Sequence, residues 1–453
     1  MSNPSQANGL LARLGLRTKE QRAWAMYDWA NSAMVTIVVT AVYPLFFLRY
    51  AAEGLSGEVA IFRHGIASTI GLAIIAVLAP FLGAMADYKA IKKRMLGTFM
   101  GIGVAAVVMM FFIGQGNWLF AAILFVLANV GASGSFVFYD ALLPHVAPTK
   151  ELDRVSTAGY AMGYIGGGLL LAACLAVILY PWLVGLPSGD DLSPSMGSLP
   201  TRLAFVAVAV WWIVFAIPLF RHVPEPAVKA LSDEERRQGL ARAAVSRLKR
   251  TFRELRRYRN AFVMLLAFLI YNDGIGTIIR MAVIFGNEIG IGQGALIGAI
   301  LLVQFVGIPF AFLFGGLAGW IGTKRAIFLG LTVYAGISMV GYFMTTATHF
   351  FILAILVGMV QGGTQALSRS LFGSMIPRHE SGEFFGLFAV FEKFAGIMGP
   401  ALFSLMIALT GSSRNAILSI IVFFVVGGLL LLLVNVEEGQ KVAREAERAA
   451  DGR

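Results

Sequence analysis

Charged residues and cysteine are both scarce in this chain. Only 13% of its 453 residues are Asp, Glu, Lys or Arg, about half the share that is usual in soluble proteins. Cys174 is the single cysteine and lies in an apolar run, so no disulfide forms within the chain and cysteine usage indicates no compartment. With 58% hydrophobic residues and a mean hydropathy of +0.77, this composition excludes an ordinary soluble protein and favours an integral membrane protein.

Sequence motifs of catalysis and nucleotide binding are missing as well. The chain has no His-Glu-x-x-His, no phosphate-binding Gly-rich loop with a lysine and no pair of thiols. Its five histidines fall at the ends of apolar segments or between them, which argues against a buried histidine relay. We therefore expect a protein that is not an enzyme, binds neither metal nor cofactor, and draws on a gradient rather than on ATP.

The chain is rich in long apolar segments. A helix needs about 20 mostly apolar residues to cross a bilayer, and we expect an all-α integral membrane protein with twelve such spans. The predicted spans are residues 24–49, 65–88, 95–114, 118–143, 154–180, 203–221, 260–287, 292–320, 326–346, 350–376, 383–410 and 414–436.

Basic residues outnumber acidic ones, with a net charge of +11, but their placement excludes nucleic acid as a partner. If both termini and the even-numbered turns are cytoplasmic, that side holds 29 of the 36 Lys and Arg residues and the other side holds four. This bias is the positive-inside pattern. It predicts a multi-pass protein of the bacterial cytoplasmic membrane, with an uncleaved N-terminus and both termini in the cytoplasm.

A basic segment divides the spans six and six. Residues 222–259 have a helical pattern from residue 231 to residue 258. We interpret them as a cytoplasmic linker helix that either binds anionic lipids or a partner, or only joins the halves. The predicted organisation is a cytoplasmic tail (1–23), an N-terminal half (24–221), this linker, a C-terminal half (260–436) and a second cytoplasmic tail (437–453).

Two polar clusters interrupt the apolar segments, one in each half. They read YDWANS at 27–32 and YNDG at 271–274. A carboxylate inside a bilayer costs about 3 kcal/mol on insertion scales, so such groups usually line a water-filled path or a substrate site. Carboxylates at matching places in two halves, Asp28 and Asp273, therefore predict a transporter.

Short strings also repeat between the halves. GAMAD at 83–87, followed by basic residues, resembles GGLAG 232 residues later, and ALLPH at 141–145 resembles SMIPR 233 residues later. The first copy, with Asp87, Lys92 and Arg94, resembles the short signature between the second and third helices of the major facilitator superfamily, and this resemblance implies a gating contact. The second copy carries Gly319 in place of the acid, so it has no carboxylate with which to form the equivalent contact.

Two six-span halves around a central linker resemble the major facilitator superfamily. Six strings together resemble the vacuole effluxer (autophagy-related) family and its bacterial relatives of unknown substrate: YDWANSA (27–33), FYDALLP (138–144), GYAMGYIGGG (159–168), YNDG (271–274), QALSRS (365–370) and EFFG (383–386). The resemblance covers all twelve spans. It implies a major facilitator fold and, from the fungal members, export of amino acids from the vacuole.

Polar residues at helical spacing form stripes on four predicted spans. The resemblance implies that these spans, the first, fourth, seventh and tenth, line a central cavity, so we expect substrate-binding or coupling residues there. The alternative is that they pair across helices and only hold the bundle together. The stripes comprise Asp28 and Asn31; Asn129, Ser133, Phe136 and Asp140; Asn272, Asp273 and Arg280; and Gln361, Gln365 and Arg369.

Two further charges, Glu392 and Lys393, are adjacent on the eleventh span. Neighbours on a helix point in different directions, so we expect each to meet a partner on another helix, Glu392 with Arg369. Such a pair is either a proton-linked switch or a fixed structural contact. If protons drive transport, carboxylates must carry them, and Asp28, Asp273 and Glu392 are the candidates because Asp140 lies near the predicted inner end of its span.

The sequence thus predicts a secondary transporter that works by alternating access and exports a small polar substrate, with amino acids first by resemblance and protons as coupling ion. Arg369 with Asp28 or Asp273 would offer a zwitterion both charges. The alternatives are an exporter of lipid-like or drug-like amphiphiles and a non-transporting membrane sensor or scaffold that signals through the linker.

Overall fold

The computed structural model describes residues 10–187, 192–227, 257–288, 290–396 and 398–450, where the regular structure is helical. Twelve helices or helix runs are long and apolar enough to cross a membrane, which confirms the expected number. They are Lys19–Ala51, Gly57–Asp87, Lys92–Phe112, Trp118–Val146, Thr149–Leu179, Pro194–His222, Arg259–Ala282, Gly294–Ile321, Thr323–Tyr342, Ala347–Ser374, Arg378–Thr410 and Ser413–Leu432.

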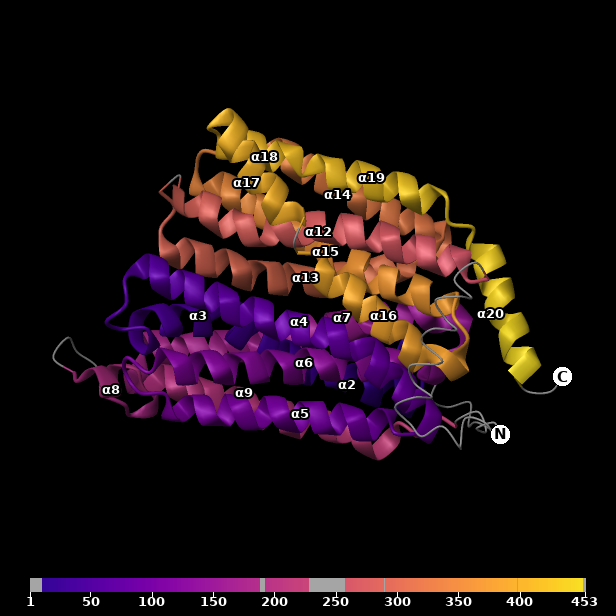
Figure 1. The fold of residues 1–453 in the computed structure, drawn as a ribbon, viewed down its shortest axis with the longest axis horizontal. Helices are drawn as coiled ribbons and strands as arrows, with labels where there is room; N and C mark the ends of the chain where they lie inside the picture. Colours follow the sequence, from indigo (N-terminus) through magenta and orange to yellow (C-terminus); the bar gives the residue numbers. More distant parts are fainter. Residues whose placement is uncertain (1–9, 188–191, 228–256, 289, 397, 451–453) are drawn as a thin grey trace.

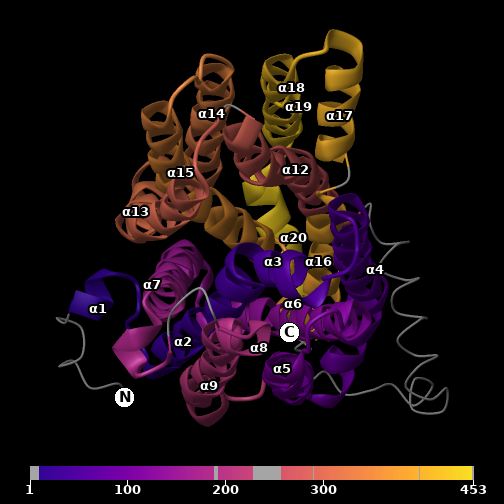
Figure 2. The same cartoon turned by 90° about the vertical axis from the view of Figure 1, so that its left-hand side faces the viewer.

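The spans form two bundles that lie side by side along a common long axis (Figures 1 and 2). The N-terminal half contains α1 (Leu10–Arg13), α2 (Lys19–Ala33), α3 (Tyr43–Phe46), α4 (Gly57–Lys89), α5 (Lys92–Met109), α6 (Trp118–Val146), α7 (Leu152–Leu179), α8 (Pro194–Gly197) and α9 (Leu199–His222). The C-terminal half contains α12 (Arg259–Glu288), α13 (Gln293–Ile321), α14 (Thr323–Tyr342), α15 (Ala347–Ser374), α16 (Ser381–Phe394), α17 (Met398–Thr410), α18 (Ser413–Ser419), α19 (Ile421–Leu432) and α20 (Val436–Ala450).

Each half has its own apolar core, and several helix pairs join the halves. One cluster of buried apolar side chains belongs mainly to residues 16–223 and another mainly to residues 258–446. Between the halves, α4 packs against α16, and α7 packs against α13 and α15. This arrangement leaves α2, α6, α12 and α15 around the centre of the molecule.

The first span begins earlier than predicted and changes its helical form. Thr18 caps α2 in a capping box with Gln21, which starts the helix at Lys19 rather than at residue 24. Beyond α2 the chain continues as π-helix over Met34–Ala41 and again over Phe47–Ala51. Wider π turns are frequent at functional sites, and the segment Met34–Ala41 lies beside the cavity described below.

The eleventh span is not one continuous helix, as the prediction of a single 383–410 segment assumed. Helix α16 ends at Phe394 and α17 begins at Met398. At the start of α17 the backbone N–H of Gly399 donates to Oδ2 of Asp273, which is fully buried on α12, at 2.8 Å. A carboxylate at this position accepts a hydrogen bond from a backbone N–H that has no partner within its own helix. Its negative charge also interacts favourably with the positive N-terminal end of the helix dipole.

The polar C-terminal segment lies at one end of the molecule. Most of the predicted linker, residues 228–256, lies outside the described residues. The second predicted tail forms α20, which packs against the ends of α12 and α15 (Figure 1). We refer to this end as the α20 end and to the opposite one as the α8 end.

Candidate functional site

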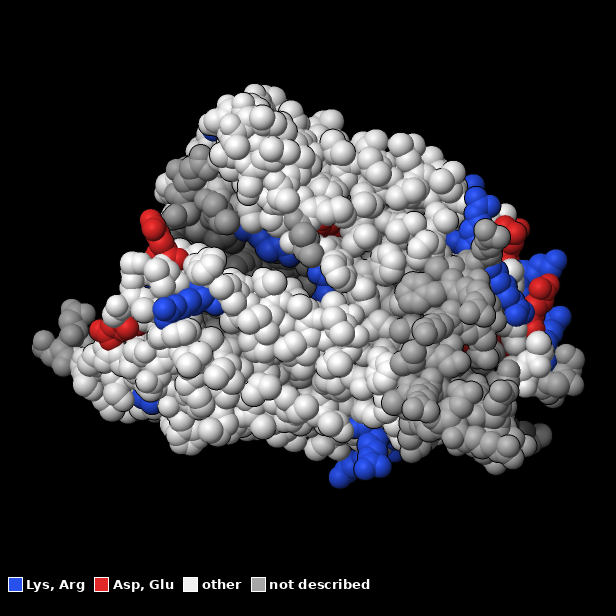
Figure 3. Space-filling model, viewed as in Figure 1, with Lys and Arg blue, Asp and Glu red and all other residues white. Residues whose placement is uncertain are grey.

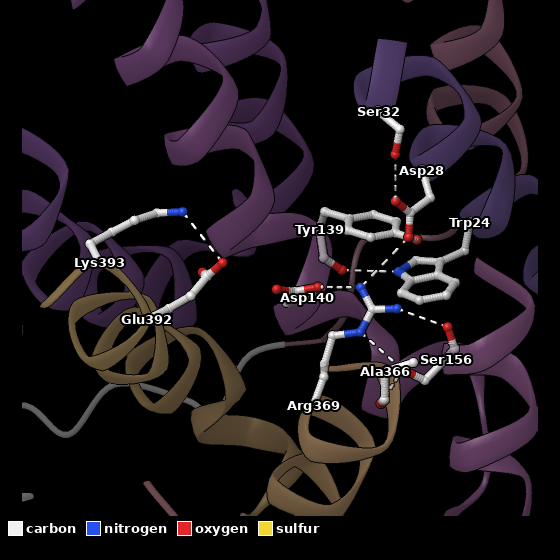
Figure 4. Close-up of polar contacts among 10 residues, drawn as sticks. All are labelled: Trp24, Asp28, Ser32, Tyr139, Asp140, Ser156, Ala366, Arg369, Glu392 and Lys393. Atoms are coloured by element: carbon white, nitrogen blue, oxygen red, sulfur yellow. Dashed lines mark hydrogen bonds and ion pairs between the residues drawn. The ribbon is translucent and has the colours of Figure 1, made fainter. Parts of the chain in front are cut away.

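A buried guanidinium bridges the two halves at the centre of the molecule. Arg369 lies on α15 with its side chain 3% exposed, and its Nη1 donates to Oδ1 of Asp140 on α6 at 2.8 Å. The same nitrogen is 3.7 Å from Oδ2 of Asp28 on α2 (Figure 4). Buried charges need compensation by close partners, so both carboxylates of the N-terminal half hold a cation of the C-terminal half.

Ser156 on α7 completes the contacts of this guanidinium. Nε of Arg369 donates to Oγ of Ser156 and Nη2 donates to the Ser156 carbonyl oxygen, both at 3.0 Å. The Ser156 hydroxyl in turn donates to the carbonyl oxygen of Ala366 at 2.7 Å. All three guanidinium nitrogens therefore donate to the N-terminal half, which fixes the orientation of Arg369 as well as its charge.

Aromatic rings surround the same cation. The guanidinium carbon of Arg369 lies 4.7 Å from the ring centroid of Tyr160, 5.0 Å from that of Trp24 and 5.6 Å from that of Tyr139. The Tyr139 hydroxyl donates to Oδ2 of Asp28 at 3.2 Å. Aromatic faces attract a cation more strongly where water is excluded, so the rings add to the ion pairs.

A polar cavity of about 330 Å³ lies beside this cluster, between the halves. The stripes predicted on the fourth and tenth spans lie on its wall, together with Asp28 and Asn272 from the first and seventh. Towards the α8 end the surface is hollowed between the halves, and basic side chains are visible inside (Figure 3). The predicted residues on the wall are Asp28, Asn129, Ser133, Phe136, Asp140, Asn272, Gln361, Gln365, Arg369, Glu392 and Lys393.

An apolar chamber of about 230 Å³ adjoins this cavity in the C-terminal half. Val35, Thr36, Gln304 and Gln361 line both spaces, so the two are neighbours across a shared wall. Apart from Thr40 and Ser338, the remaining lining is apolar, and most of it comes from α12, α13, α14, α15 and α18. A ligand in the polar cavity therefore has an apolar surface within reach.

The structure places three of the predicted residues away from the cavity wall. Asp273 faces α17 inside the C-terminal half, and Arg280, two turns along α12, lies 4.0 Å from its Oδ1. Asn31 is fully buried in the N-terminal half, where its amide donates to Oγ of Ser135 at 3.2 Å. The expectation that Asp273 faces the central cavity is therefore wrong, because helix α17 starts against it.

The predicted partner of Arg369 was also wrong. Glu392 pairs with its neighbour Lys393, with Oε1 and Nζ 3.4 Å apart (Figure 4). Both side chains are long enough to meet, although neighbours on a helix point in different directions. Asp140, which was expected near the inner surface, forms the ion pair with Arg369. The Glu392–Lys393 pair instead presents one negative and one positive group to the cavity.

Sequence reasoning missed the residues that α7 contributes. Ser156 and Tyr160 contact Arg369, and Tyr164 lines the cavity. Tyr164 also lies between Gly307 on α13 and Gly362 on α15, where an added Cβ would come within 2.8 and 2.4 Å of its ring. The spacing of four between Tyr160 and Tyr164 was the available signal, in a segment that the glycines suggested was only for packing.

The cavity can pair charges and exchange them. A ligand carboxylate could compete with Asp140 for Arg369, and a ligand ammonium could compete with Lys393 for Glu392. Amide groups stand ready nearby: Nε2 of Gln365 donates to Oδ1 of Asn272 at 3.3 Å. In the described part of the chain, no group of three His, Cys, Asp or Glu side chains gathers in a way that could hold a metal ion.

The α20 end is closed by the predicted gating string. Asp87, at the end of α4, accepts hydrogen bonds from the backbone N–H groups of Gly382 at 3.0 Å and Glu383 at 2.8 Å, at the start of α16. Nζ of Lys92 lies 2.5 Å from the same carboxylate. Arg94, two residues after Lys92 on α5, is exposed. Asp87 thus closes this end by capping a helix of the other half.

We expect Gly83→Ala to prevent this closure. A Cβ at residue 83 would lie 2.0 Å from the carbonyl oxygen of Gly382, and backbone cannot move aside as a side chain can. Overpacking of this kind costs about 1–3 kcal/mol, so hydrogen exchange of the Gly382 and Glu383 amides should accelerate roughly tenfold. Gly101→Ala on α5, where no atom lies within 4 Å, is the matched control; equal exchange in both variants would contradict the closure described here.

Comparison with known proteins supports the same architecture. The structure is similar to the proton:xylose symporter XylE, with a TM-score of 0.69 at 12% identity over 94% of this chain and 98% of that one. It is also similar to FucP, a major facilitator superfamily transporter in the outward conformation, with a TM-score of 0.64 at 12% identity over 92% of this chain and 98% of that one. At these identities the likeness concerns the fold.

Sequence relatives are more specific. The chain is 38% identical over 429 residues to the uncharacterized MFS-type transporter YxiO of Bacillus subtilis (strain 168), covering 94% of this chain and 97% of that protein. It is 23% identical to autophagy-related protein 22 of Coccidioides immitis (strain RS), covering 85% and 74%. The family model described as vacuole effluxer Atg22 like matches residues 65–444. This chain therefore belongs to the Atg22-like vacuole effluxer family and is an MFS-type transporter.

Proposed function

We propose that the protein is a secondary active transporter that exports small zwitterionic metabolites, amino acids first, in exchange for protons. The observation that carries this proposal is the cation of one half held by two carboxylates of the other, beside a polar cavity. A substrate carboxylate can compete for Arg369, and protons can compete for Asp28 and Asp140. Either event weakens the contact between the halves, as alternating access requires.

The cavity offers a zwitterion two separate partners. Glu392, with its side chain 38% exposed, is available to an ammonium group, and Lys393 beside it is available to a carboxylate. Ligand binding would then replace the Glu392–Lys393 contact with two new ion pairs. A ligand shifts the balance between two states only by binding them unequally, and a pair that opens on binding supplies that difference.

A second candidate substrate class follows from the apolar chamber. Its position beside the polar cavity suits an amphiphile whose charged head lies near Glu392 and whose apolar part enters the chamber. Exporters of lipid-like or drug-like amphiphiles need such a surface. A sensor without transport activity has no use for a cavity of this polarity between two movable halves.

The proposed orientation places the α20 end in the cytoplasm of a bacterial cell. The positive-inside bias of 29 basic residues to four supports it, as does the position of α20 and of the linker's two ends. Anionic lipids of the inner leaflet would then face the basic linker. In this orientation the structure is closed to the cytoplasm and hollowed toward the outside.

Flux in proteoliposomes tests the function. With a pH gradient imposed, we expect accumulation of one or more zwitterionic amino acids from a panel that also contains sugars, organic acids and fluorescent amphiphiles. Thiols placed at Glu53 and Arg448, after replacement of Cys174, report the orientation of the protein in the same vesicles. Flux of amphiphiles alone would favour the second candidate, and no flux of any compound would favour a sensor.

A further inference from the structure

A second polar contact closes the α20 end on the opposite side of the molecule from Asp87. Asp153 lies in the first turn of α7, and its two carboxylate oxygens accept hydrogen bonds from the C-terminal half. Oδ1 accepts from the hydroxyl of Ser370 on α15, and Oδ2 accepts from the hydroxyl of Thr323 at the start of α14, both at 2.5 Å. Hydrogen bonds to a charged acceptor are among the stronger ones.

This contact lies at the second copy of the gating string, residues 315–319, which has no acid. Gly315 stands 232 residues after Gly83, and each is a point where the two halves touch. A Cβ on Gly83 would lie 2.0 Å from Gly382 on α16, and one on Gly315 would lie 2.1 Å from Oγ1 of Thr157 on α7. The close approach is thus repeated, although Gly319 has replaced the acid of the first copy.

In the second contact the carboxylate comes from the helix that packs against the string, not from the string itself. In the first contact the string between α4 and α5 supplies the carboxylate, and α16 supplies the donors. In the second, the string between α13 and α14 supplies a donor, Thr323, and α7 supplies the carboxylate. Lys324, which corresponds to Lys92, is also used differently: its ammonium donates to the carbonyl oxygens of Leu432 and Val434 at the end of α19.

We propose that Asp153 is a positioning residue of the transport cycle that holds the α20 end closed in place of the missing acid at residue 319. Its position joins the closure to the central site, because Ser370 follows Arg369 on α15 and Asp153 lies one turn before Ser156 on α7. Both hydrogen bonds that the described residues donate to its carboxylate come from the C-terminal half. They must break when the halves part at this end.

Two thiol reporters measure the state of each end, in a chain whose single native cysteine has been replaced by alanine. Gly373→Cys reports the α20 end: the residue is buried, and a Cβ there would lie 3.3 Å from the ring of Phe385 and 3.8 Å from that of Pro144. Thr40→Cys reports the α8 end, where Thr40 is exposed and lines the apolar chamber. Neither reporter requires a substrate or a gradient, so the result is independent of the proposed function.

In Asp153→Asn we expect alkylation by N-ethylmaleimide to become about tenfold faster at the Gly373→Cys reporter and slower at the Thr40→Cys reporter. Thr323→Val and Ser370→Ala each remove one donor while keeping the carboxylate, and each should produce a smaller change, about threefold, in the same directions. Thr332→Val is the matched control, because its hydroxyl donates to Phe328 within α14.

Three results would overturn the proposal. The first is alkylation of both reporters in Asp153→Asn at the rates of the control. The second is faster alkylation of both reporters together, which indicates a loosened fold rather than a shift between states. The third is a change in Asp153→Asn that neither donor variant reproduces, since the carboxylate would then act through other partners.

Discussion

Transport by the Arg369→Ala variant is expected to fall below detection while the protein remains folded. The substitution removes the cation that compensates Asp140 and Asp28, and it leaves the Ser156 acceptors without their donors. Removing one partner of a buried pair costs about 3–5 kcal/mol, which corresponds to a roughly 150- to 4,000-fold loss in the population of the state described here. The remaining carboxylates can take up protons, which limits the damage to the fold.

Arg369→Lys should restore little of this activity. A lysine ammonium can reach one carboxylate, but it cannot donate from three fixed nitrogens to Asp140 and both oxygens of Ser156. The measurement is substrate exchange in proteoliposomes, with thermal unfolding as the check of folding. Arg325→Ala on α14, where the arginine is exposed, serves as control. Normal exchange in both Arg369 variants would assign the cluster to structure alone.

Proton-driven accumulation should be lost in Asp28→Asn, in Asp140→Asn, or in both, while exchange of substrate continues. Asparagine fixes a neutral side chain at a position where we propose that a proton binds and leaves. Asp28 retains polar partners in Tyr139 and Ser32 when it is neutral, so the site can still form. Without a titrating group, however, a pH gradient has nothing to act on and cannot drive uphill movement.

Asp273→Asn is the informative comparison for this experiment. From sequence, Asp273 was expected to be a coupling residue together with Asp28, but its carboxylate lies against Gly399 rather than in the cavity. An asparagine oxygen can still accept that hydrogen bond, so we expect coupling to persist in this variant. If Asp28→Asn and Asp140→Asn both concentrate substrate under a pH gradient, the proton path lies elsewhere, with Glu392 as the next candidate.

The fold was largely predictable from sequence because membrane insertion imposes a strong and simple signal. Twelve apolar segments and a one-sided distribution of basic residues define the spans, and repeated strings define the halves. The break between α16 and α17 was not predicted. Gly396, with a φ of +157°, lies at the break, but it is one of many glycines within the spans, and the carboxylate that accepts from the start of α17, Asp273, lies on another span.

The sequence predicted which helix faces line the cavity, but not which residues pair with one another across it. Helical spacing placed Gln361, Gln365 and Arg369 on one stripe, and the cavity indeed lies along it. Which carboxylate meets Arg369 depends on the vertical offset and rotation between helices of different halves. Sequence spacing within one helix carries no information on either, so Asp140 was set aside and Ser156 was missed.

The bridge at Arg369 also bears on how the protein is made. The N-terminal half leaves the ribosome first, with two carboxylates on α2 and α6 whose cation is encoded more than 200 residues later. Until α15 inserts, the N-terminal half carries uncompensated negative charge at depth, which a bilayer tolerates poorly. Late docking of the halves thus becomes a checkpoint of biogenesis, and a chain that ends before α15 would leave acidic groups in the membrane for quality-control proteases to recognise.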